Sequence, residues 1–245
     1  MQREAYFEMY HHEDHHWWFI SRRMIVQKVL DRCLSDGNTR SILEVGCGTG
    51  GNFELLSKYG DLRALEQDDD ARDMANRRGL CLVAKGFLPD NIPFSETFDL
   101  ICMLDVLEHI DDDLKILQEI SKRLNSNGKL LLTVPAYEFL WSEHDITLAH
   151  KRRYRKKQLI QLVKRAGLDS VCSTYFNTFL FPVIAVTRFL NKALGKKGGT
   201  DVNMPSNFRN VLLTKIFSSE KLLIPRISLP FGVSILLVAK KSMKV

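Results

Sequence analysis

The sequence predicts an α/β fold in which helices cover both faces of a mainly parallel, doubly wound sheet. Two observations support this prediction. Short apolar runs of strand length alternate with segments of helical periodicity, and closely spaced glycines directly follow one of the runs. Ligands of such sheets bind beyond the carboxyl ends of the strands, so the glycines also predict where a site lies. The composition, 45% hydrophobic and 26% charged over 245 residues, is that of a globular domain.

Apolar runs and periodic segments follow one another along most of the chain. Apolar residues at helical spacing over 17–34 predict a helix before the first strand. The later apolar runs are short and lack polar alternation, which suits buried parallel strands with helices between them. We expect strands over 42–45, 62–65, 81–84, 100–103, 130–134, 168–176 and 232–240, and further helices over 52–58, 71–78, 112–124 and 158–166.

A long stretch separates the last two expected strands. Within it, residues 178–190 are strongly apolar but too few to span a bilayer, which takes about 20 apolar residues. We expect a helix that lies on a surface or covers the substrate, with an ordinary packed helix or a dimer-interface helix as the alternative. The flanking basic residues suit an anionic membrane surface: Arg188, Lys192, Lys196 and Lys197.

One domain with four parts accounts for this order of elements. The parts are an N-terminal helical segment (1–40), a core (41–176), a helical insertion (177–231) and a last strand (232–245). No internal repeat is present in the sequence. A mobile loop is expected over 194–207, which is rich in Gly, Lys and polar residues.

Basic residues are concentrated in the C-terminal part of the chain. Residues 1–150 hold 16 Lys or Arg against 26 Asp or Glu, whereas residues 151–245 hold 19 against 3. The density is highest over 151–157, K-R-R-Y-R-K-K. Such a field favours anionic partners, namely phosphate groups, anionic lipid or nucleic acid. For any single residue of this run, the alternative is a solvated start of a helix.

Cysteine and histidine usage bears on location and metals. Five scattered cysteines without a C-x-x-C pair indicate reduced thiols and a cytoplasmic protein. The N-terminus is acidic and His-rich, so we expect no secretory signal. Its histidines have spacings that can share a metal on a helix, but no Cys or His pair elsewhere completes a tetrahedral set, and no metal is expected. These histidines are His11, His12, His15 and His16.

The glycines after the first strand predict a nucleotide-binding turn. Gly46, Gly48 and Gly51 satisfy the dinucleotide pattern G-x-G-x-x-G, whereas Gly46, Gly48 and Gly50 satisfy the tighter G-x-G-x-G. Glu66 directly follows the second expected strand, about 20 residues after the turn, where a carboxylate can accept hydrogen bonds from ribose hydroxyls. The glycines and Glu66 therefore fit both classes of cofactor.

The residues around the turn favour one class. Glu44 completes E-x-G-x-G-x-G, 98–110 reads F-D-L-I-C-M-L-D-V-L-E-H-I, and 123–130 reads R-L-N-S-N-G-K-L. Together these motifs resemble class I S-adenosylmethionine-dependent methyltransferases over about residues 40–135, with Asn127 in place of one glycine. The resemblance implies a Rossmann-like, seven-stranded sheet with an antiparallel last strand. The helical insertion before that strand departs from the plain pattern of the superfamily. Trp17, Trp18 and Arg22 are expected to form part of an N-terminal helical lid over the cofactor, with core packing of the two tryptophans as the alternative.

Further segments narrow the resemblance. Residues 134–154 read V-P-A-Y-E-F-L-W-S-E-H-D-I-T-L-A-H-K-R-R-Y, residues 229–237 read L-P-F-G-V-S-I-L-L, and residues 16–19 read H-W-W-F. This set resembles a bacterial methyltransferase subgroup associated with cell-envelope glycan or lipid-linked sugar metabolism. It implies a type of enzyme more securely than a substrate.

The resemblance also assigns cofactor contacts. S-adenosylmethionine would be the methyl donor and S-adenosylhomocysteine the product, with much of the acceleration coming from alignment. Glu66 would hold the ribose hydroxyls and Glu44 would support the methionyl amino group. Phe87 stands where many relatives carry an Asp for the adenine amino group, with Gln67 packed alongside. The remaining contacts would be the turn residues Gly46, Cys47, Gly48 and Gly50, the strand residues Leu104, Asp105 and Val106, and the lid residues Trp18 and Arg22.

Histidines after the fourth and fifth strands are candidates for proton removal. His144 beside Asp145 is the preferred base, and His109 is a further catalytic candidate. Structural roles for these histidines are the alternative, and some methyl transfers need no strong base. The residues expected to shape the substrate pocket, or to contact a phosphate or carboxylate in it, are Tyr137, Trp141, His150, Arg153 and Tyr154.

Methyl transfer to a small-molecule or lipid-linked, anionic acceptor is the favoured function, for a cytoplasmic protein that contacts the inner face of the membrane peripherally. A nucleic-acid methyltransferase is an alternative because of the basic half, but residues 104–107 lack the Pro-Pro-aromatic sequence of enzymes that methylate base amino groups. A non-catalytic cofactor-binding or membrane-recruited protein is a third possibility. An NAD-linked oxidoreductase is disfavoured because nothing beyond the glycine turn suggests hydride transfer.

Overall fold

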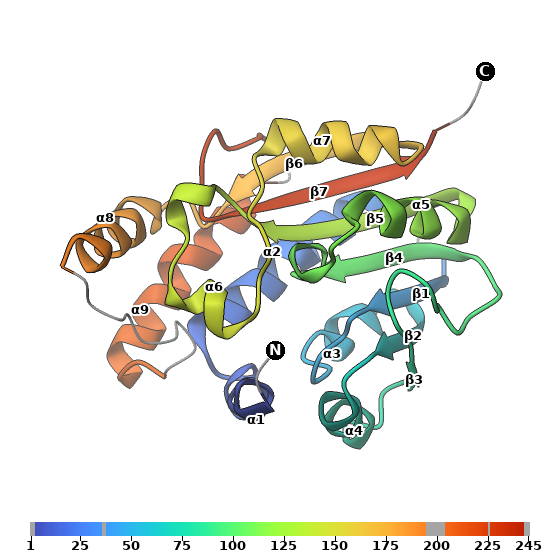
Figure 1. The fold of residues 1–245 in the computed structure, drawn as a ribbon, viewed down its shortest axis with the longest axis horizontal. Coiled ribbons are helices and arrows are strands. Elements are labelled where there is room, and N and C mark those ends of the chain that lie inside the picture. Colours follow the sequence, from blue (N-terminus) through green and yellow to red (C-terminus); the bar gives the residue numbers. More distant parts are fainter. Residues whose placement is uncertain (1–2, 36–37, 195–203, 225, 243–245) are drawn as a thin grey trace.

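Seven strands form one mixed sheet that runs through the molecule (Figure 1). The computed structural model describes residues 3–35, 38–194, 204–224 and 226–242. The strand order is β3-β2-β1-β4-β5-β7-β6, in which β1 to β5 are parallel and β7 runs antiparallel to both β5 and β6. The strands are β1 (Arg40–Val45), β2 (Gly60–Glu66), β3 (Leu82–Lys85), β4 (Phe98–Leu104), β5 (Leu124–Pro135), β6 (Leu168–Phe176) and β7 (Ser234–Lys241).

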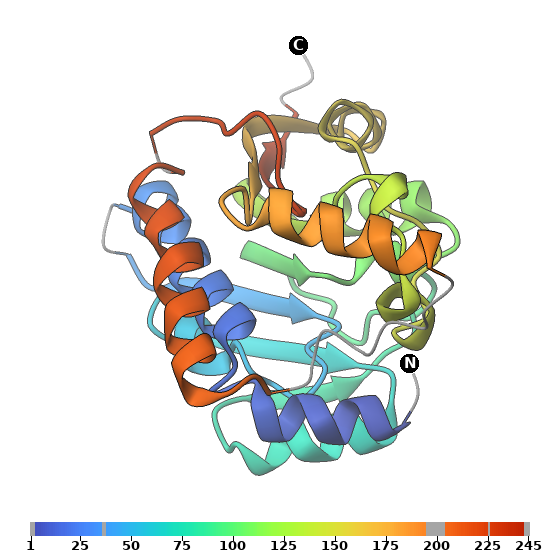
Figure 2. The ribbon, with the colours of Figure 1, turned by 90° about the vertical axis from the view of Figure 1, so that its left-hand side faces the viewer.

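Helices cover both faces of this sheet (Figures 1 and 2). Polar caps fix several of their starts. The Asp68 side chain accepts a hydrogen bond from the Ala71 backbone at the start of α4, and Asp112 accepts one from Lys115 at the start of α5. The helices are α1 (Arg3–His12), α2 (Trp17–Cys33), α3 (Phe53–Leu56), α4 (Asp69–Arg77), α5 (Asp113–Arg123), α6 (Glu143–Thr147), α7 (Lys156–Arg165), α8 (Phe181–Ala193) and α9 (Asn207–Ser218).

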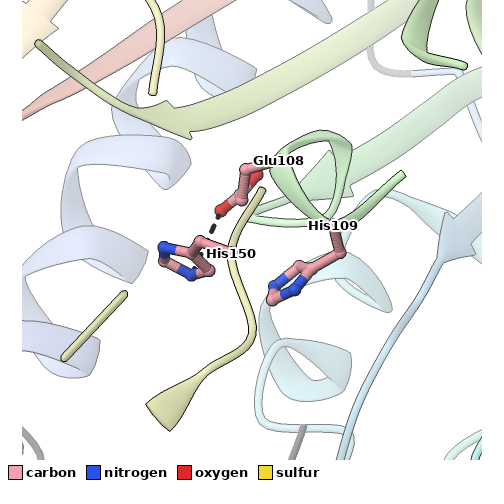
Figure 3. A group of neighbouring side chains, drawn as sticks. All are labelled: Glu108, His109 and His150. Atoms are coloured by element: carbon pink, nitrogen blue, oxygen red, sulfur yellow. Dashed lines mark ion pairs between the residues drawn. The ribbon is translucent and has the colours of Figure 1, made fainter. Parts of the chain in front are cut away.

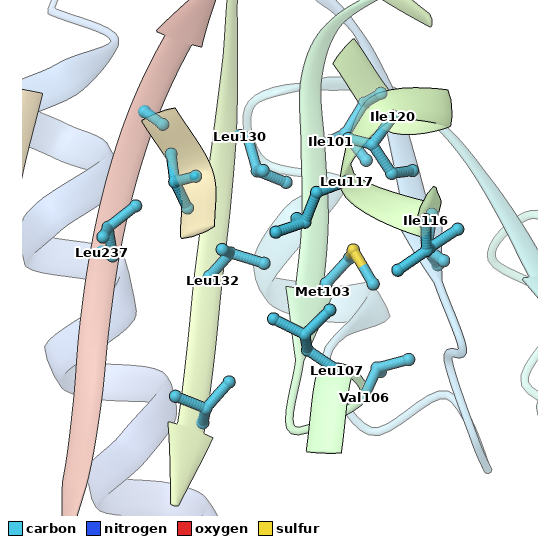
Figure 4. Packing of buried hydrophobic residues seen from close by; sticks show 14 of the residues in the cluster. Ile101, Met103, Val106, Leu107, Ile116, Leu117, Ile120, Leu130, Leu132 and Leu237 are labelled. Carbon is cyan, nitrogen blue, oxygen red and sulfur yellow. The ribbon is translucent and has the colours of Figure 1, made fainter. Parts of the chain in front are cut away.

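Alternate residues of the central strands face two hydrophobic layers. Leu130 and Leu132 of β5 pack with residues of α5 and α7, and Figure 4 shows this layer around Ile101 and Met103 of β4. Leu131 faces the opposite layer, which α2 and α9 complete. Successive residues of β5 point to opposite faces of the sheet, and both faces are covered, so β5 is buried on both sides.

The helical insertion and the N-terminal segment lie against each other. The Asn210 side chain in α9 accepts a hydrogen bond from the Trp17 backbone at 2.8 Å and donates one to the His15 carbonyl at 2.8 Å. Phe217 of α9 is fully buried and stacks on Phe176 at the end of β6. Segments from opposite parts of the sequence therefore form one wall beside the sheet, in which α9 runs along α2 (Figure 2).

The predicted fold class is confirmed, including the antiparallel strand β7 and the insertion before it. Each expected strand is present, with bounds that differ by up to six residues. The expected helix over 52–58 is reduced to Phe53–Leu56, and the apolar helix expected from 178 begins at Phe181, next to Pro182. No separate helix was predicted at α1, α6 or α9, although α1 lies in the expected N-terminal helical segment and α9 in the expected helical insertion. The loop expected over 194–207 lies mostly outside the described residues.

Candidate active site

A cavity of about 1050 Å³ opens beyond the carboxyl ends of β1, β2, β4 and β5. The glycine turn and the end of β2 line one side of it. The turn after β4, the segment around α6, and helix α8 line the other. The cavity therefore lies where the order of the strands reverses, between β1 and β4, which is the expected position in a doubly wound sheet.

The glycine turn and Glu66 hold each other in place. Gly46 and Gly48 have φ values of +68° and +56°, which side chains rarely adopt. The Gly48 backbone N–H donates to Glu66 Oε2 at 2.8 Å, while Oε1 accepts from the backbone of Gln67 and Asp68, both at 2.9 Å. A Cβ at Gly46 would lie 2.9 Å from both methyl groups of Val106, so the turn packs directly on the end of β4.

Beneath the turn lies a chain of buried polar groups. Glu44 Oε1 accepts a hydrogen bond from Asn52 at 2.7 Å, and Asn52 in turn accepts a 3.4 Å bond from Arg22. Arg22 forms an ion pair with Asp105 and lies 4.7 Å from the centre of the Trp18 ring. Burial raises the pKa of Glu44 to about 7. Glu44 Oε2 has no hydrogen-bond partner among the described residues, which leaves one acceptor near the turn unsatisfied.

The N-terminal segment closes over the glycine turn through Glu13. Its Oε1 accepts a hydrogen bond from Thr49 Oγ1 at 2.6 Å and pairs with Arg78 at 2.6 Å. Tyr6 and Met9 of α1 also line the cavity. The sequence predicted a lid from Trp18 and Arg22 onward but assigned no role to Glu13, because its partners are 36 and 65 residues away.

A second polar cluster faces the same cavity from the turn after β4. Glu108 and His109 lie in the 3-10 turn Leu107–His109, and His150 approaches them from the segment after α6 (Figure 3). His150 Nε2 is 3.9 Å from Glu108 Oε1. Burial and the nearby Asp105 carboxylate raise the pKa of Glu108 well above its usual range. Burial and the nearby His150 ring lower the pKa of His109 to about 4, so that His109 is neutral at pH 7.

The expected pairing of His144 with Asp145 needs correction. Asp145 is fully buried and lies 2.8 Å from His150 Nδ1, and Arg153 bonds both of its oxygens at 2.8 and 2.9 Å. Burial alone would raise the pKa of Asp145, but these hydrogen bonds and the Arg153 charge hold it below its usual range. Asp145 does not line the cavity, whereas His144, His150 and Arg153 do. Asp145 therefore orients His150 rather than the adjacent histidine, because neighbouring side chains on α6 point in different directions.

Five other predicted contacts lie outside the cavity lining. Phe87 is 49% exposed, while its neighbours Gly86 and Leu88 face the cavity. Tyr137 stacks on Tyr175, and Tyr154 is buried with its hydroxyl donating to Asp113 at 3.1 Å. These two tyrosines thus support the wall from behind. Gly50 and Glu44 also stand behind the surface, while the predicted residues that line the cavity are Trp18, Arg22, Gly46, Cys47, Gly48, Glu66, Gln67, Leu104, Asp105, Val106, His109, Trp141, His144, His150 and Arg153.

The residues present fit the cofactor that the motif resemblance implies. Gly48 has no atom within 4 Å of where a Cβ would lie, so the turn leaves open space on the cavity side. The Glu66 carboxylate borders that space and is held by three backbone N–H groups. An anchored carboxylate beside an open glycine turn suits a ribose with two hydroxyl groups. Gly48, Glu66 and Gln67 would hold the nucleoside side, and Arg22, Asn52 and Asp105 the amino-acid side.

Helix α8 contributes a wall that the sequence predicted only in outline. Ile184, Thr187, Arg188 and Asn191 line the cavity opposite the glycine turn. Arg188 also donates a 2.8 Å hydrogen bond to the Leu140 carbonyl, which ties α8 to the segment after β5. The apolar pattern of this segment predicted a helix that lies on a surface or covers the substrate, or else an ordinary packed or dimer-interface helix. The inner face of α8 lines the cavity.

Several known proteins with similar sequences are named as methyltransferases. The sequence profile of a family described as methyltransferase domain matches residues 16–173. Over 120 residues, 45% of this chain and 36% of the relative, the chain is 30% identical to the mitochondrial ubiquinone biosynthesis O-methyltransferase of Candida albicans. Over 146 residues, 56% of this chain and 38% of the relative, it is 24% identical to the chloroplastic tocopherol O-methyltransferase of Arabidopsis thaliana. The matched region thus spans little more than a third of these curated relatives.

The fold has solved counterparts. A crystal structure of an S-adenosylmethionine-dependent methyltransferase from Clostridium acetobutylicum ATCC 824 has a TM-score of 0.58 with this chain, covers 91% of it and 92% of its own length, and is 14% identical. At this identity the likeness concerns the fold alone. The site rests on the residues described above.

Proposed function

This chain belongs to the methyltransferase-domain family and has the class I S-adenosylmethionine-dependent fold, and from that premise we propose that it transfers a methyl group from S-adenosylmethionine to a hydroxyl group of a small, lipid-linked acceptor. The observation that carries the proposal is the shared cavity. The glycine turn with Glu66 borders one side, and Glu108, His109 and His150 border the other. One continuous space is thus lined by a nucleoside-binding turn and by groups able to handle a proton.

The residues of this chain have distinct parts in the proposed reaction. S-adenosylmethionine, when bound, supplies an electrophilic methyl group on a sulfonium. Gly48 and Glu66 orient the nucleoside, and the ring of Trp18 faces the cavity, where an aromatic face favours a neighbouring cation. His109 and His150 face the acceptor side and receive the hydroxyl proton, with Asp145 acting through His150. His144 and Trp141 shape the acceptor pocket.

A lipid-linked acceptor is supported by helix α8, which has two distinct faces. Its inner face lines the cavity, and its outer face exposes Val186, Phe189 and Leu190, which are 58%, 72% and 50% exposed. Such an apolar helix at the rim of a cavity gives a hydrophobic tail a path out of the site. The names of the O-methyltransferases reported above refer to ubiquinone and tocopherol, and these names support an acceptor with a hydrophobic tail.

Charge favours an anionic membrane as the surface that covers α8 and α9. The outer side of α9 exposes Phe208 and Val211, which are 79% and 52% exposed, and both helices lie on the same side of the molecule (Figures 1 and 2). No acidic residue lies in either helix, whereas Arg188, Lys192, Arg209 and Lys215 do. We therefore expect peripheral binding to the inner face of the membrane by a cytoplasmic protein. Among the described residues, no helix has the length and apolar character to span a membrane.

The cell-envelope subgroup stays a prediction, because the relatives reported above do not carry that description. An anionic acceptor, such as a lipid phosphate, is likewise a prediction. It rests on the basic C-terminal part and on Arg188 and Arg153, which line the cavity. Both point to polyprenyl-linked sugars, phenols and small acids as the acceptors to screen.

Calorimetric titration with S-adenosylhomocysteine tests the proposal first. Gly48→Arg should abolish saturable binding, because the new side chain fills the open side of the turn. Gly79→Arg is the matched control. Its φ of +65° imposes similar backbone strain, and no atom lies within 4 Å of a Cβ there, but Gly79 does not line the cavity. NADH serves as the competing ligand.

Three outcomes decide between the functions. Binding of S-adenosylhomocysteine that Gly48→Arg removes and Gly79→Arg keeps supports the cofactor site, and acceptors can then be screened for methyl transfer. Preference for NADH, or equal loss in both variants, contradicts the proposal. Binding without transfer to any phenol, acid or polyprenyl-linked sugar would favour a non-catalytic cofactor-binding protein.

A further inference from the structure

Glu108 is the most unusual buried group in the cavity wall. Its side chain is fully buried, and neither carboxylate oxygen has a hydrogen-bond partner among the described residues. A buried carboxylate without hydrogen bonds is costly unless another charge or a metal compensates it. The His150 ring lies closest to an ion-pair distance, with its Nε2 3.9 Å from Oε1, too far for a hydrogen bond. The charges of Arg153 and Arg22 also act on Glu108.

The surroundings of Glu108 have the composition of a metal site. Glu108, His109 and His150 each offer one ligand atom, and these atoms lie within 4.8 Å of one another. Figure 3 shows the three side chains gathered at one place from two separate segments. A metal about 2.1 Å from each ligand needs them about 3.0 to 3.4 Å apart, so side-chain movements of about 1 to 2 Å would close the site.

Both histidines are oriented as metal ligands usually are. His150 Nδ1 lies 2.8 Å from Asp145, and His109 Nδ1 lies 3.4 Å from the Ala149 carbonyl. Each ring therefore has its Nδ1 beside an oxygen and its Nε2 left for another partner. A carboxylate or carbonyl behind the ligating histidine fixes its tautomer and direction. Arg153 in turn holds Asp145 through both oxygens.

We propose that Glu108, His109 and His150 bind one divalent transition-metal ion. Two imidazoles and one carboxylate are the ligand set that suits Zn²⁺ and its first-row neighbours better than Mg²⁺ or Ca²⁺. All three residues line the cavity, so the remaining coordination positions face the space for the acceptor. Three protein ligands with an open position are typical of catalytic rather than structural metal sites.

In the proposed reaction, which this step presupposes, the metal would activate the acceptor hydroxyl. With a metal bound to their Nε2 atoms, His109 and His150 would no longer receive the hydroxyl proton themselves. The cation would instead attract the acceptor hydroxyl and lower its pKa, so that its proton would leave to water at neutral pH. The oxygen electron pair then forms the new O–CH₃ bond. The S–CH₃ bond breaks and its electrons remain on sulfur, so that S-adenosylhomocysteine leaves uncharged at that atom.

Metal binding is measured without cofactor or acceptor. Protein stripped with a chelator and then dialysed is titrated with Zn²⁺ by calorimetry, and with Co²⁺ by visible absorption, with Mg²⁺ for comparison. We expect one Zn²⁺ or Co²⁺ per chain at the cluster. Glu108→Gln, His109→Gln and His150→Gln should each weaken it at least ten-fold. Circular dichroism verifies that each variant is folded, and any one folded variant is sufficient for the test.

Two controls address the other histidines. His144→Gln removes a histidine of the same cavity, and the double variant His11→Gln/His12→Gln removes two from α1. Both controls should keep the affinity of the cluster. Absence of saturable binding, or binding that Glu108→Gln keeps and the α1 variant loses, overturns the metal site. Titration of the same samples with S-adenosylhomocysteine distinguishes failure of the metal site from failure of the proposed function. Metal binding without cofactor binding would contradict the proposed function and leave the metal site standing.

Discussion

Glu44 is a carboxyl group placed where water cannot reach it, directly under the glycine turn. It is fully buried, with one oxygen bonded to Asn52 and the other without a described partner. Burial raises its pKa to about 7, so the folded protein holds a proton there at pH values at which the unfolded chain has lost it. The stability of the cofactor-free protein therefore depends on pH through this residue.

The sign of that dependence can be predicted. Between about pH 4.5 and 7 the folded state binds more protons at Glu44 than the unfolded state, so the free energy of unfolding falls as pH rises, by up to about 3 kcal/mol. Glu44→Gln should remove this decline. Urea denaturation at several pH values measures it, with Glu54→Gln, an exposed residue of α3, as the control. Parallel pH profiles of the wild type and Glu44→Gln would show that the residue is not the cause.

Single residues also show how far the sequence could predict the site. The glycines, Glu66 and the end of β4 were predicted because their spacing along the chain is short and regular. The link between Asp145, Arg153 and His150 was not, and nor was the approach of His150 to Glu108, which is 42 residues away. Such contacts depend on how the segment after β5 folds back over the turn after β4, and no local pattern encodes that path.

The segment just after helix α1 is fixed to the glycine turn by one side chain. Glu13, just after α1, joins Thr49 of the glycine turn to Arg78 at the end of α4. It is 4% exposed, so these bonds are protected from solvent. The Arg78 Nε also donates to the Thr49 carbonyl at 2.8 Å, which makes the junction three-sided. A lid held in this way keeps the cofactor side of the cavity covered.

Loss of the Glu13 charge should loosen that lid. We expect Glu13→Gln to weaken S-adenosylhomocysteine binding about ten-fold, since charge-assisted hydrogen bonds contribute roughly 1.5 to 3 kcal/mol. Asp14→Asn is the matched control, because Asp14 pairs with the same Arg78 at 3.2 Å but has a 49% exposed side chain. Calorimetry compares the two. Equal affinities for both variants would mean that the lid does not depend on Glu13.

Helix α9 stabilises the fold through a single face. Phe217 is fully buried against Phe176 and Trp17, whereas Phe208 on the same helix is 79% exposed. Phe217→Ala should lower the free energy of unfolding by about 3 to 5 kcal/mol, because it leaves a cavity between α2, α9 and the sheet. Phe208→Ala should change it by less than about 0.5 kcal/mol. Urea denaturation measures both, and similar losses would contradict the assigned packing.

The elements missed by the sequence lack a regular pattern. Ala5 is the one buried residue of α1 among those described, so no apolar stripe marks the helix. Helix α6 has only five residues and is held by the contacts of Asp145 with His150 and Arg153 in the irregular segment that follows it. Helix α9 exposes several large apolar residues and buries few. Periodicity predicts elements that face one core, whereas these three owe their positions to partners elsewhere.

At the scale of the whole molecule, apolar and basic groups share one side. Vesicles that contain phosphatidylglycerol should bind the protein in a salt-sensitive manner, and pure phosphatidylcholine vesicles should bind it weakly. The double variant Phe189→Glu/Phe208→Glu should abolish binding. Leu82→Glu, a 68% exposed residue at the β3 edge of the sheet, should leave it unchanged. Co-sedimentation measures the binding of the wild type to both kinds of vesicle and the binding of both variants to the anionic vesicles.

Other outcomes of that experiment are equally clear. Equal binding to neutral and anionic vesicles would remove charge from the explanation. The protein could bind neither kind of vesicle and instead self-associate in a way that Phe189→Glu/Phe208→Glu abolishes. That result would assign the surface of α8 and α9 to a second copy of the chain. Unchanged binding in the double variant would place the contact on another surface.

Strand β7 lies between β5 and β6, although it comes last in the sequence. Until residues 234–241 arrive, β6 has no neighbour in the sheet, because β7 is its pairing partner. A nascent chain therefore completes β1 to β5 first, by local crossovers, and closes the acceptor half only once β7 has been made. Pulse proteolysis of stalled chains measures this order. Synthesis thus produces the half of the sheet beside the methyl donor before the half beside the acceptor is complete.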